Sequence, residues 1–153
     1  MRILITGSRF WSDRAAVETA LRYVAAGLVP EAVTVVHGAC PYGGADTIAG
    51  DIAARWGCAV DEHPADWDMF GKAAGPIRNQ EMVDLGADVC LAFPETGSRG
   101  TWDCVRRAEN AGIPVGVDYT AIPVPTNAVR LARDVATGNL VQIPWTPLQT
   151  NHT

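Results

Sequence analysis

One segment, residues 88–108, constrains the fold more than any other part of the chain. It opens with the apolar run Val89–Phe93, and the following Pro94 cannot donate to a sheet ladder, so the run predicts a buried strand. A glycine-bearing loop, Glu95 to Thr101, comes next, and apolar side chains then recur at helical spacing. Strand, loop and helix start in this order direct backbone N–H groups and a helix dipole to one point, which suits a phosphate or a carboxylate. On this segment alone, an anion-binding loop and a plain strand-to-helix turn are equally supported.

The composition and the charge of the chain limit both its architecture and its partners. Its 153 residues, 48% hydrophobic and 19% charged, suit one globular domain with a substantial core. The formal net charge of -5 argues against a protein that mainly binds nucleic-acid backbone, because such binding needs a basic patch. No apolar run approaches the roughly 20 residues of a membrane span, and the start of the chain turns polar within about six residues, unlike a signal peptide. We therefore expect a cytoplasmic protein without a membrane partner.

The four cysteines are spread along the chain, at Cys40, Cys58, Cys90 and Cys104. They have neither CxxC spacing nor the spacing of a Cys/His cluster. This pattern favours buried thiols over disulfides and predicts no metal site.

Apolar runs alternate with helical patterns over the first 117 residues. Strands are expected at Arg2–Thr6, Val33–His37, Cys58–Glu62, Val89–Phe93 and Ile113–Val117. Helices are expected between Asp13 and Gly27, and over Ala45–Trp56, Ile77–Leu85 and Thr101–Ala111. This alternation predicts an α/β fold, a Rossmann-like doubly wound parallel sheet with strand order 3-2-1-4-5.

Two segments depart from the alternation. Residues 64–76 have no periodic pattern and contain prolines and glycines, so we expect an exposed loop of about a dozen residues. The sequence predicts one domain over residues 1–119 and a C-terminal extension over residues 120–153. In that extension Pro123 and Pro125 form a stiff linker, Asn127–Ala136 fits a short amphipathic helix, and Leu140–Ile143 fits a strand. The extension is expected to pack across the domain or onto a second subunit.

The unusual loops all follow strands, so they fall on one rim of the predicted sheet. In such sheets ligands bind outside the carboxyl ends of the strands, at the point where the strand order reverses. The chain has no GxxxxGK[ST], HExxH, GxSxG or GxGxxG signature. The rim instead carries arginines, carboxylates and tryptophans, which suit a phosphate, ribose hydroxyls and a base respectively. These residues are Arg9, Arg78, Arg99, Asp46, Asp66, Asp103, Trp11, Trp67 and Trp102.

Four motifs in order carry a resemblance to a known family: Gly7-Ser8-Arg9, HGACPYGGAD, GPIRNQEM and SRGTWDCVRRA. Together they resemble the YspA-like, cpYpsA-related branch of the SLOG superfamily over residues 1 to about 117. That superfamily also includes the LOG-type cytokinin-nucleotide phosphoribohydrolases and the DNA-binding protein DprA. The resemblance implies a Rossmann-like nucleotide-binding domain.

In LOG-type enzymes a PGGxGT motif followed by a glutamate holds the nucleotide phosphate, and an upstream arginine works with that glutamate on the N-glycosidic bond. By resemblance, residues 97–101 occupy the phosphate-loop positions, Arg78 matches the arginine, and Asp103 stands where the glutamate should be. The loop is longer here, and aspartate reaches about one methylene less far than glutamate. The resemblance therefore implies a nucleotide-type ligand more firmly than it implies turnover.

Several of these residues also have a purely structural interpretation. Asp103 and Asp46 lie near helix starts, where carboxylates favour the dipole; the two roles are evenly matched for Asp103, and the structural one is favoured for Asp46. Arg78 gains nothing from the dipole, which favours a functional role. His37, at a strand end, fits a core-edge histidine. Trp67, in a polar segment, is a better candidate for stacking on a base than Trp102.

We therefore predict a binding module or sensor for a nucleotide-type small molecule, with no metal and no cofactor, and a homodimer formed through the helices at 77–85 and 101–111. The alternatives are a nucleoside monophosphate phosphoribohydrolase and, disfavoured by the net charge, a DprA-like single-stranded DNA binder. The predicted catalytic residues are Arg78 and Asp103. The predicted ligand-binding residues are Gly7, Ser8, Arg9, Gly38, Gly44, Asp46, Asp66, Trp67, Asn79, Gly97, Ser98, Arg99, Gly100 and Thr101.

Overall fold

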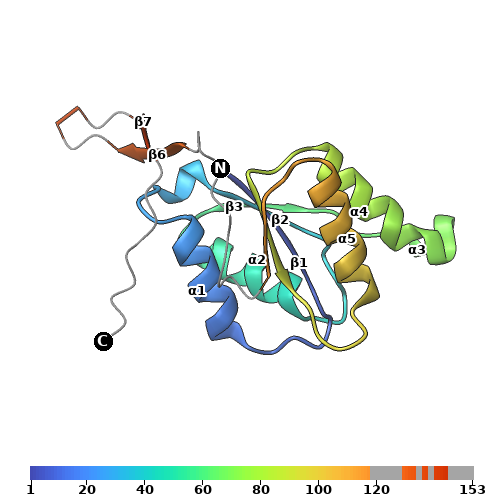
Figure 1. Ribbon diagram of the computed structural model, residues 1–153. Helices are drawn as coiled ribbons and strands as arrows, with labels where there is room; N and C mark the ends of the chain where they lie inside the picture. The colour runs from blue at the N-terminus through green and yellow to red at the C-terminus, as the bar shows by residue number, and fades with distance from the viewer. Residues whose placement is uncertain (118–128, 134–135, 138–139, 145–153) are drawn as a thin grey trace.

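Five parallel strands form one sheet, in the order β3-β2-β1-β4-β5 (Figure 1). The computed structural model describes residues 1–117, 129–133, 136–137 and 140–144. The strands of the sheet are β1 (Arg2–Gly7), β2 (Thr34–His37), β3 (Ala59–Glu62), β4 (Val89–Phe93) and β5 (Val115–Val117). The helices are α1 (Arg14–Val24), η1 (Pro30–Ala32), α2 (Ala45–Trp56), α3 (Trp67–Phe70), η2 (Gly71–Ala73), α4 (Ala74–Asp84) and α5 (Arg99–Asn110). The predicted α/β class and strand order are confirmed.

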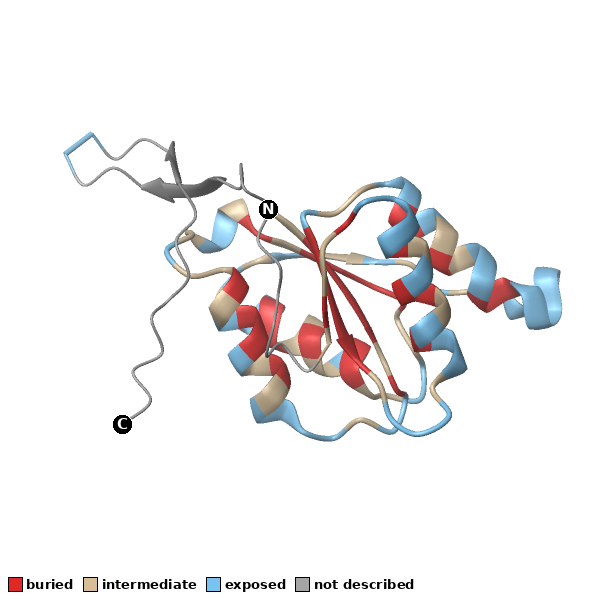
Figure 2. Cartoon of the chain, viewed as in Figure 1, coloured by how far each residue is buried: buried red, intermediate tan, exposed pale blue. Residues whose placement is uncertain are grey.

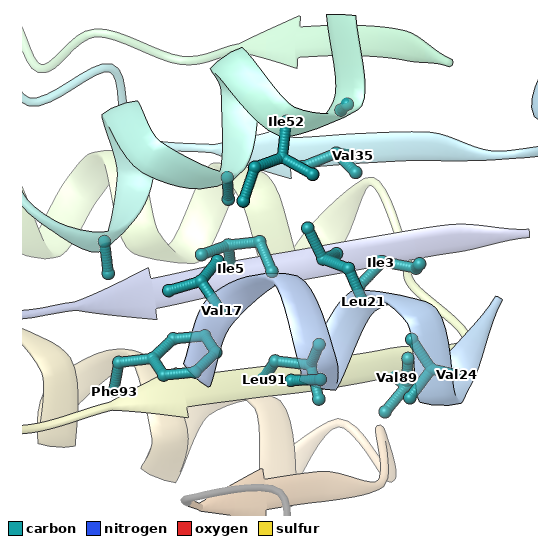
Figure 3. Packing of buried hydrophobic residues seen from close by; sticks show 14 of the residues in the cluster. Ile3, Ile5, Val17, Leu21, Val24, Val35, Ile52, Val89, Leu91 and Phe93 are labelled. Atoms are coloured by element: carbon teal, nitrogen blue, oxygen red, sulfur yellow. The ribbon is translucent and has the colours of Figure 1, made fainter. Parts of the chain in front are cut away.

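Strand β1 has a hydrophobic core on each of its faces. Ile3 and Ile5 point to the side of α1 and α2, where they pack with residues such as Leu21 and Ile52 (Figure 3). Leu4, the residue between them, belongs to the second core, formed with α4 and α5. Since successive strand side chains point to opposite faces, a run that is apolar without interruption is what a sheet covered on both sides requires. Figure 2 shows the buried strands between the two helical layers.

The strand order reverses between β1 and β4. From β1 the chain runs through α1 to β2 and through α2 to β3, and then returns to the other side of β1 through α4. β1 and β4 pair from Ile3 opposite Val89 to Gly7 opposite Phe93. The loops that leave these two strands therefore start side by side, at the place where doubly wound sheets bind ligands.

The segment at residues 64–76 is mostly exposed, as expected, but it is helical from Trp67 onward, so the predicted loop is wrong. Asp66 caps α3, because its Oδ1 accepts a hydrogen bond from the Met69 amide at 2.9 Å. α4 then begins at Ala74, and Pro76 lies in its first turn. Because N–H groups in the first turn have no acceptor within the helix, proline is tolerated there. Because the segment is exposed, its helices leave no apolar periodicity for the sequence to reveal.

The C-terminal extension contains a two-stranded antiparallel sheet. β6 (Val129–Arg133) pairs with β7 (Leu140–Pro144), so the predicted strand at 140–143 is confirmed and the predicted helix over 127–136 is wrong. Val129 and Leu131 recur at a spacing of two as well as at helical spacing with later residues, and pairing with β7 supplies the strand with backbone hydrogen bonds. The predicted linker at Pro123 and Pro125 lies outside the described residues, and the packing of the extension stays a prediction.

Among the described residues, no helix is long and apolar enough to span a membrane.

Candidate functional site

The loops after β1 and β4 are tied together by a hydrogen bond at the switch point. The Ser8 hydroxyl donates to Glu95 Oε2 at 2.6 Å, and Ser8 Oγ also accepts from the Phe10 amide at 3.0 Å. The Ser8 amide donates to the Phe93 carbonyl at 2.9 Å, and the Glu95 amide donates to Ser98 Oγ at 2.9 Å. We call Ser8, Glu95 and residues 97–101 the switch-point junction. It is the place where the predicted ligand-binding serines and the predicted phosphate loop meet.

The predicted phosphate loop is partly the first turn of α5, which begins at Arg99 and not at Thr101. Gly97 supports the turn with a left-handed φ of 80°. No side chain of the described residues caps α5, and its first turn has no acidic residue. Beside it lies an open depression of about 670 Å³, lined by Pro94, Glu95, Thr96 and Trp102. The helix start therefore faces open space with its positive dipole end unneutralised by a carboxylate from its own first turn.

Arg78 does not point at the phosphate loop. Its Nη1 donates to the carbonyl oxygens of Gly38 and, at 3.3 Å, of His63, which follow β2 and β3. Its Nε donates to Asn79 Oδ1 at 3.0 Å. Arg78 thus braces the ends of two strands on the far side of β1 from β4.

Asp103 is held by two donors. Its Oδ2 accepts from Asn79 Nδ2 at 3.0 Å and from Arg107 Nε at 2.9 Å. Partial burial acts to raise the pKa of the Asp103 carboxyl, but the hydrogen bonds from Arg107 and Asn79 outweigh it and hold this pKa below its usual value. Asp103 is therefore an ionised carboxylate and not a proton donor near neutral pH.

Asn79 joins the two predicted catalytic residues, because it accepts from Arg78 and donates to Asp103. Its Nδ2 also donates to the Gly100 carbonyl at 3.2 Å, which connects this group to the start of α5. We call Arg78, Asn79, Asp103 and Arg107 the α4–α5 network. The network unites Arg78 and Asp103 through an intermediate side chain and not by direct contact.

Asp46 is a buried carboxyl at the start of α2. Its Oδ2 accepts from the Gly38 amide at 3.0 Å. Burial raises the pKa of Asp46 to about 6, although the charge of Arg78 and the Gly38 hydrogen bond act in the opposite direction. A Cβ at Gly38 would overlap the Arg78 guanidinium and approach the Asp46 carboxylate, so a side chain there would have to displace both groups. Gly38 and Asp46 therefore fix the backbone at the end of β2. The burial of Asp46 agrees with the structural role that the sequence favoured for it.

Gly7 and Gly44 permit a close approach between β1 and α2. A Cβ on Gly7 would overlap Ala45 Cβ, and a Cβ on Gly44 would overlap the Ser8 carbonyl. Gly44 also has a left-handed φ of 90°, and the Ala45 amide donates to the Ser8 carbonyl at 3.2 Å. The first amide of α2 is thus already paired, and these two glycines act by packing.

Asp66 and Trp67 lie away from the switch-point junction, at the start of α3. Figure 1 shows α3 projecting beyond the sheet next to α4. Asp66 caps its helix, and Trp67 is 55% exposed with its ring edge near Gly75. The described residues join neither of them to Ser8 or Glu95 by a hydrogen bond or an ion pair.

Sequence reasoning missed three residues of this rim: Glu95, Phe10 and Tyr42. The Arg9 guanidinium carbon lies 5.8 Å from the ring centroid of Phe10 and 5.8 Å from that of Tyr42. Tyr42 is part of a quoted motif, and Glu95 and Phe10 stand in loops already assigned to the rim. The sequence could have indicated these residues through their position in the rim loops. It could not have indicated that loops from different strands bring their side chains together.

The described residues contain no group of three or more His, Cys, Asp and Glu side chains that could hold a metal ion. All four cysteines are free; Cys90 and Cys104 are buried, and Cys40 and Cys58 are partly exposed.

Comparisons with known proteins support the family resemblance, and the matching family model covers the first two of the four motifs. The model of the YspA, cpYpsA-related SLOG family matches residues 1–70, which include the loops after β1, β2 and β3. The chain is also 48% identical over 123 residues to the gene 61 protein of Mycobacterium phage D29, a match that covers 74% of this chain and 93% of that protein. With the doubly wound sheet and the motifs of its rim, these similarities show that the chain belongs to the YspA, cpYpsA-related SLOG family.

Proposed function

We propose that this protein binds a nucleotide, or a nucleotide-derived phosphorylated ligand, at the switch-point junction and acts as a binding module or sensor. The observation that carries the proposal is the uncapped start of α5, whose first residue is the exposed Arg99, together with a second exposed arginine, Arg9, in the loop after β1. Arg9 and Arg99 have no carboxylate within ion-pair distance among the described residues. Exposed guanidinium groups next to a positive helix end favour a dianionic partner such as a phosphate.

The two sides of the junction offer different chemistry. On the α5 side, backbone N–H groups and Arg99 suit a phosphate. On the β1 side, the Ser8 hydroxyl donates to the carboxylate of Glu95 from the β4 loop, and this carboxylate suits the hydroxyls of a ribose equally well. A carboxylate repels a phosphate, so the ligand is oriented with its phosphate toward α5 and its sugar toward Ser8 and Glu95.

A second candidate function is hydrolysis of the N-glycosidic bond of a nucleoside monophosphate. It is supported by the α4–α5 network, which connects Arg78 with Asp103 and reaches the Gly100 carbonyl at the start of α5. With its lowered pKa, Asp103 would stabilise a positively charged ribosyl transition state as an anion and would not protonate the leaving base. The departing base would need its proton from another group.

Calorimetry with AMP, GMP, CMP and UMP tests the binding proposal. We expect at least one of them to bind, and Arg99→Ala to weaken that binding about tenfold or more, the loss of one charge-assisted contact. Arg55→Ala removes the same charge near the C-terminal end of α2 and serves as the control. Equal affinities in all three proteins, or no binding of any nucleotide to the parent, would contradict the proposal.

Chromatography of the same mixtures tests the hydrolase. Release of free base that is lost in Asp103→Asn would establish turnover, and its absence would leave the binding module. A salt-dependent shift of a labelled oligonucleotide would instead support the DprA-like alternative.

We also propose a homodimer through α4 and α5. The two helices pack against each other, and each exposes a large apolar side chain, Ile77 on α4 and Trp102 on α5. Surfaces of this kind commonly pair across a twofold axis. A sedimenting species of 16.3 kDa at micromolar concentration would contradict it.

A further inference from the structure

We propose that Arg9, Phe10 and Tyr42 form an aromatic platform on which the planar base of the ligand stacks. The inference rests on the proposed function and names the part of the ligand that the switch-point junction leaves unassigned. The ligand is then a nucleotide whose base contributes to affinity, and not merely a sugar phosphate.

The two rings are unusually open to solvent. Phe10 is 77% exposed and Tyr42 is 76% exposed, more than any other large apolar side chain in the described part of the chain. A single exposed aromatic residue needs no explanation. Two such rings from separate loops that share one guanidinium group form a defined surface.

Both aromatic residues stand in tight turns of the backbone. The Trp11 amide donates to the Ser8 carbonyl at 3.2 Å, which places Phe10 at the third position of a closed turn. The Gly43 amide donates to the Cys40 carbonyl at 3.2 Å, which places Tyr42 at the same position of a second turn. The backbone that carries both rings is therefore fixed before any ligand binds, which lowers the entropy lost on binding.

The two turns are also fixed to each other. Gly44 packs without a side chain against Ser8 and Arg9, and the Ala45 amide donates to the Ser8 carbonyl at 3.2 Å. Thr47 Oγ1 donates to the Cys40 carbonyl at 3.3 Å and ties the second turn to α2. Movement of one turn relative to the other would break these contacts.

The platform is continuous with the proposed sugar site. The Phe10 amide donates to Ser8 Oγ, and the same hydroxyl donates to Glu95. A base lying on the platform thus has its ribose next to Ser8 and Glu95.

The chemistry of the platform suits a nucleotide. A base stacks on an aromatic ring whatever its identity, and a guanidinium plane stacks on a base while its charge attracts the phosphate. Trp67, the stacking residue predicted from the sequence, lies on α3 and makes no ring or cation–π contact with Arg9, Phe10 or Tyr42 among the described residues. The structure therefore favours Phe10 and Tyr42 over Trp67 for this role.

The test compares ribose 5-phosphate with the nucleoside monophosphates by calorimetry. In the parent we expect a nucleotide to bind about five- to 100-fold more tightly than ribose 5-phosphate, the range of base–aromatic stacking. Phe10→Ala and Tyr42→Ala should each remove much of that difference while affinity for ribose 5-phosphate stays unchanged. Tyr42→Phe retains the ring and should retain the preference.

Met69→Ala is the matched control, since Met69 is 72% exposed, apolar and outside the platform. Thermal unfolding of each variant verifies the fold, because both aromatic side chains are exposed and their loss leaves the core intact. Equal affinity of the parent for ribose 5-phosphate and the nucleotides would overturn the platform and leave the phosphate site standing. Equal weakening of both ligands by Phe10→Ala would also overturn it. Failure of every nucleotide and of ribose 5-phosphate to bind would overturn the proposed function and the platform together.

Discussion

The switch-point junction and the α4–α5 network lie at the same edge of the sheet, yet they differ in how far their polar groups are satisfied. In the network, Asp103 accepts two hydrogen bonds, Asn79 uses both ends of its amide, and Arg78 donates to two backbone carbonyls and to Asn79. At the junction, the exposed Arg99 stands at an uncapped helix start. The polar groups of Arg78 and Asp103 are thus already hydrogen-bonded within the protein, whereas the start of α5 beside them has N–H groups without a capping side chain.

This difference in hydrogen bonding predicts that the α4–α5 network contributes mainly to stability and the switch-point junction mainly to ligand binding. A group that is partly buried and fully paired costs stability when it is removed, because its partners stay behind without a hydrogen bond. Removal of a group that is exposed and unpaired should change the unfolding free energy little and should affect only the affinity for a ligand that contacts it. Substitutions in the two regions should therefore have opposite signatures, and the following predictions test that separation from the largest effect to the smallest.

Gly44→Ala should have the largest effect, because it disrupts the packing of the start of α2 against Ser8 and Arg9. The new Cβ would overlap the Ser8 carbonyl, and the residue would have to keep a left-handed φ of 90°, so we expect a loss of about 3–5 kcal/mol of unfolding free energy. Gly43→Ala is the control, because Gly43 has a similar φ of 94° but a Cβ added there would meet no atom within 4 Å. Urea unfolding measures both. Equal losses would show that backbone strain alone, and not the contact with Ser8, requires glycine at position 44.

Asp46→Asn should change how stability depends on pH. The pKa of Asp46 is raised from 3.8 to about 6 in the folded protein, so the folded state binds the proton more tightly than the unfolded state. The contribution of this group is thus fully present below about pH 4 and is lost as pH rises through about 6, a change of about 3 kcal/mol.

Asparagine does not titrate, so the variant should lack this component. The measurement is the difference in unfolding free energy between parent and variant at several pH values from about 4 to about 8. A difference that stays constant over this range would contradict the burial argument for Asp46.

Arg78→Ala should destabilise the protein by about 1–3 kcal/mol, because the Gly38 and His63 carbonyls lose a donor and Asp46 loses a nearby positive charge. Arg99→Ala, at the junction, should change stability by less than about 0.5 kcal/mol. Thermal unfolding compares the two. Nucleotide affinity of the folded Arg78→Ala protein should fall by less than about tenfold; a loss of about 10- to 150-fold would place Arg78 on the phosphate, as the LOG-type resemblance implies.

Most of the fold could be predicted because burial imposes it on the sequence. Uninterrupted apolar runs such as Val89–Phe93 report a sheet covered on both faces, and the capping residue Asp13 marks the start of α1, where its Oδ1 accepts from the Ala16 amide at 2.9 Å. The exposed helices after Asp66 have no apolar periodicity. The segment at 129–133, predicted as part of a helix, forms a strand because it pairs with β7, which local sequence does not reveal.

The sequence could predict which loops line the site, because each of these loops follows a strand, but it could not predict the contacts between them. Ser8 and the phosphate loop could be placed on one rim, since carboxyl ends of parallel strands share an edge. The Ser8–Glu95 contact joins residues 87 positions apart, and the insertion of Asn79 between Arg78 and Asp103 depends on how α4 packs against α5. Neither is encoded in local spacing. The resemblance to LOG-type enzymes singled out Arg78 and Asp103, which the structure connects through Asn79, and their catalytic role stays a prediction.

Glu95→Gln should give the smallest effect and the most direct measure of the junction. Its amide oxygen can still accept from the Ser8 hydroxyl, so the contact between the β1 and β4 loops is kept while one negative charge is removed. If a phosphate binds at the start of α5, loss of the nearby charge should tighten the binding of ribose 5-phosphate by about two- to fivefold at low salt, and the gain should shrink as ionic strength rises. Glu109→Gln makes the same charge change at the opposite end of α5 and should leave affinity unchanged. Weaker binding by Glu95→Gln would mean that hydrogen bonds from the ribose hydroxyls to the Glu95 carboxylate outweigh its repulsion of the phosphate, and an equal gain in both variants would reduce the effect to net charge.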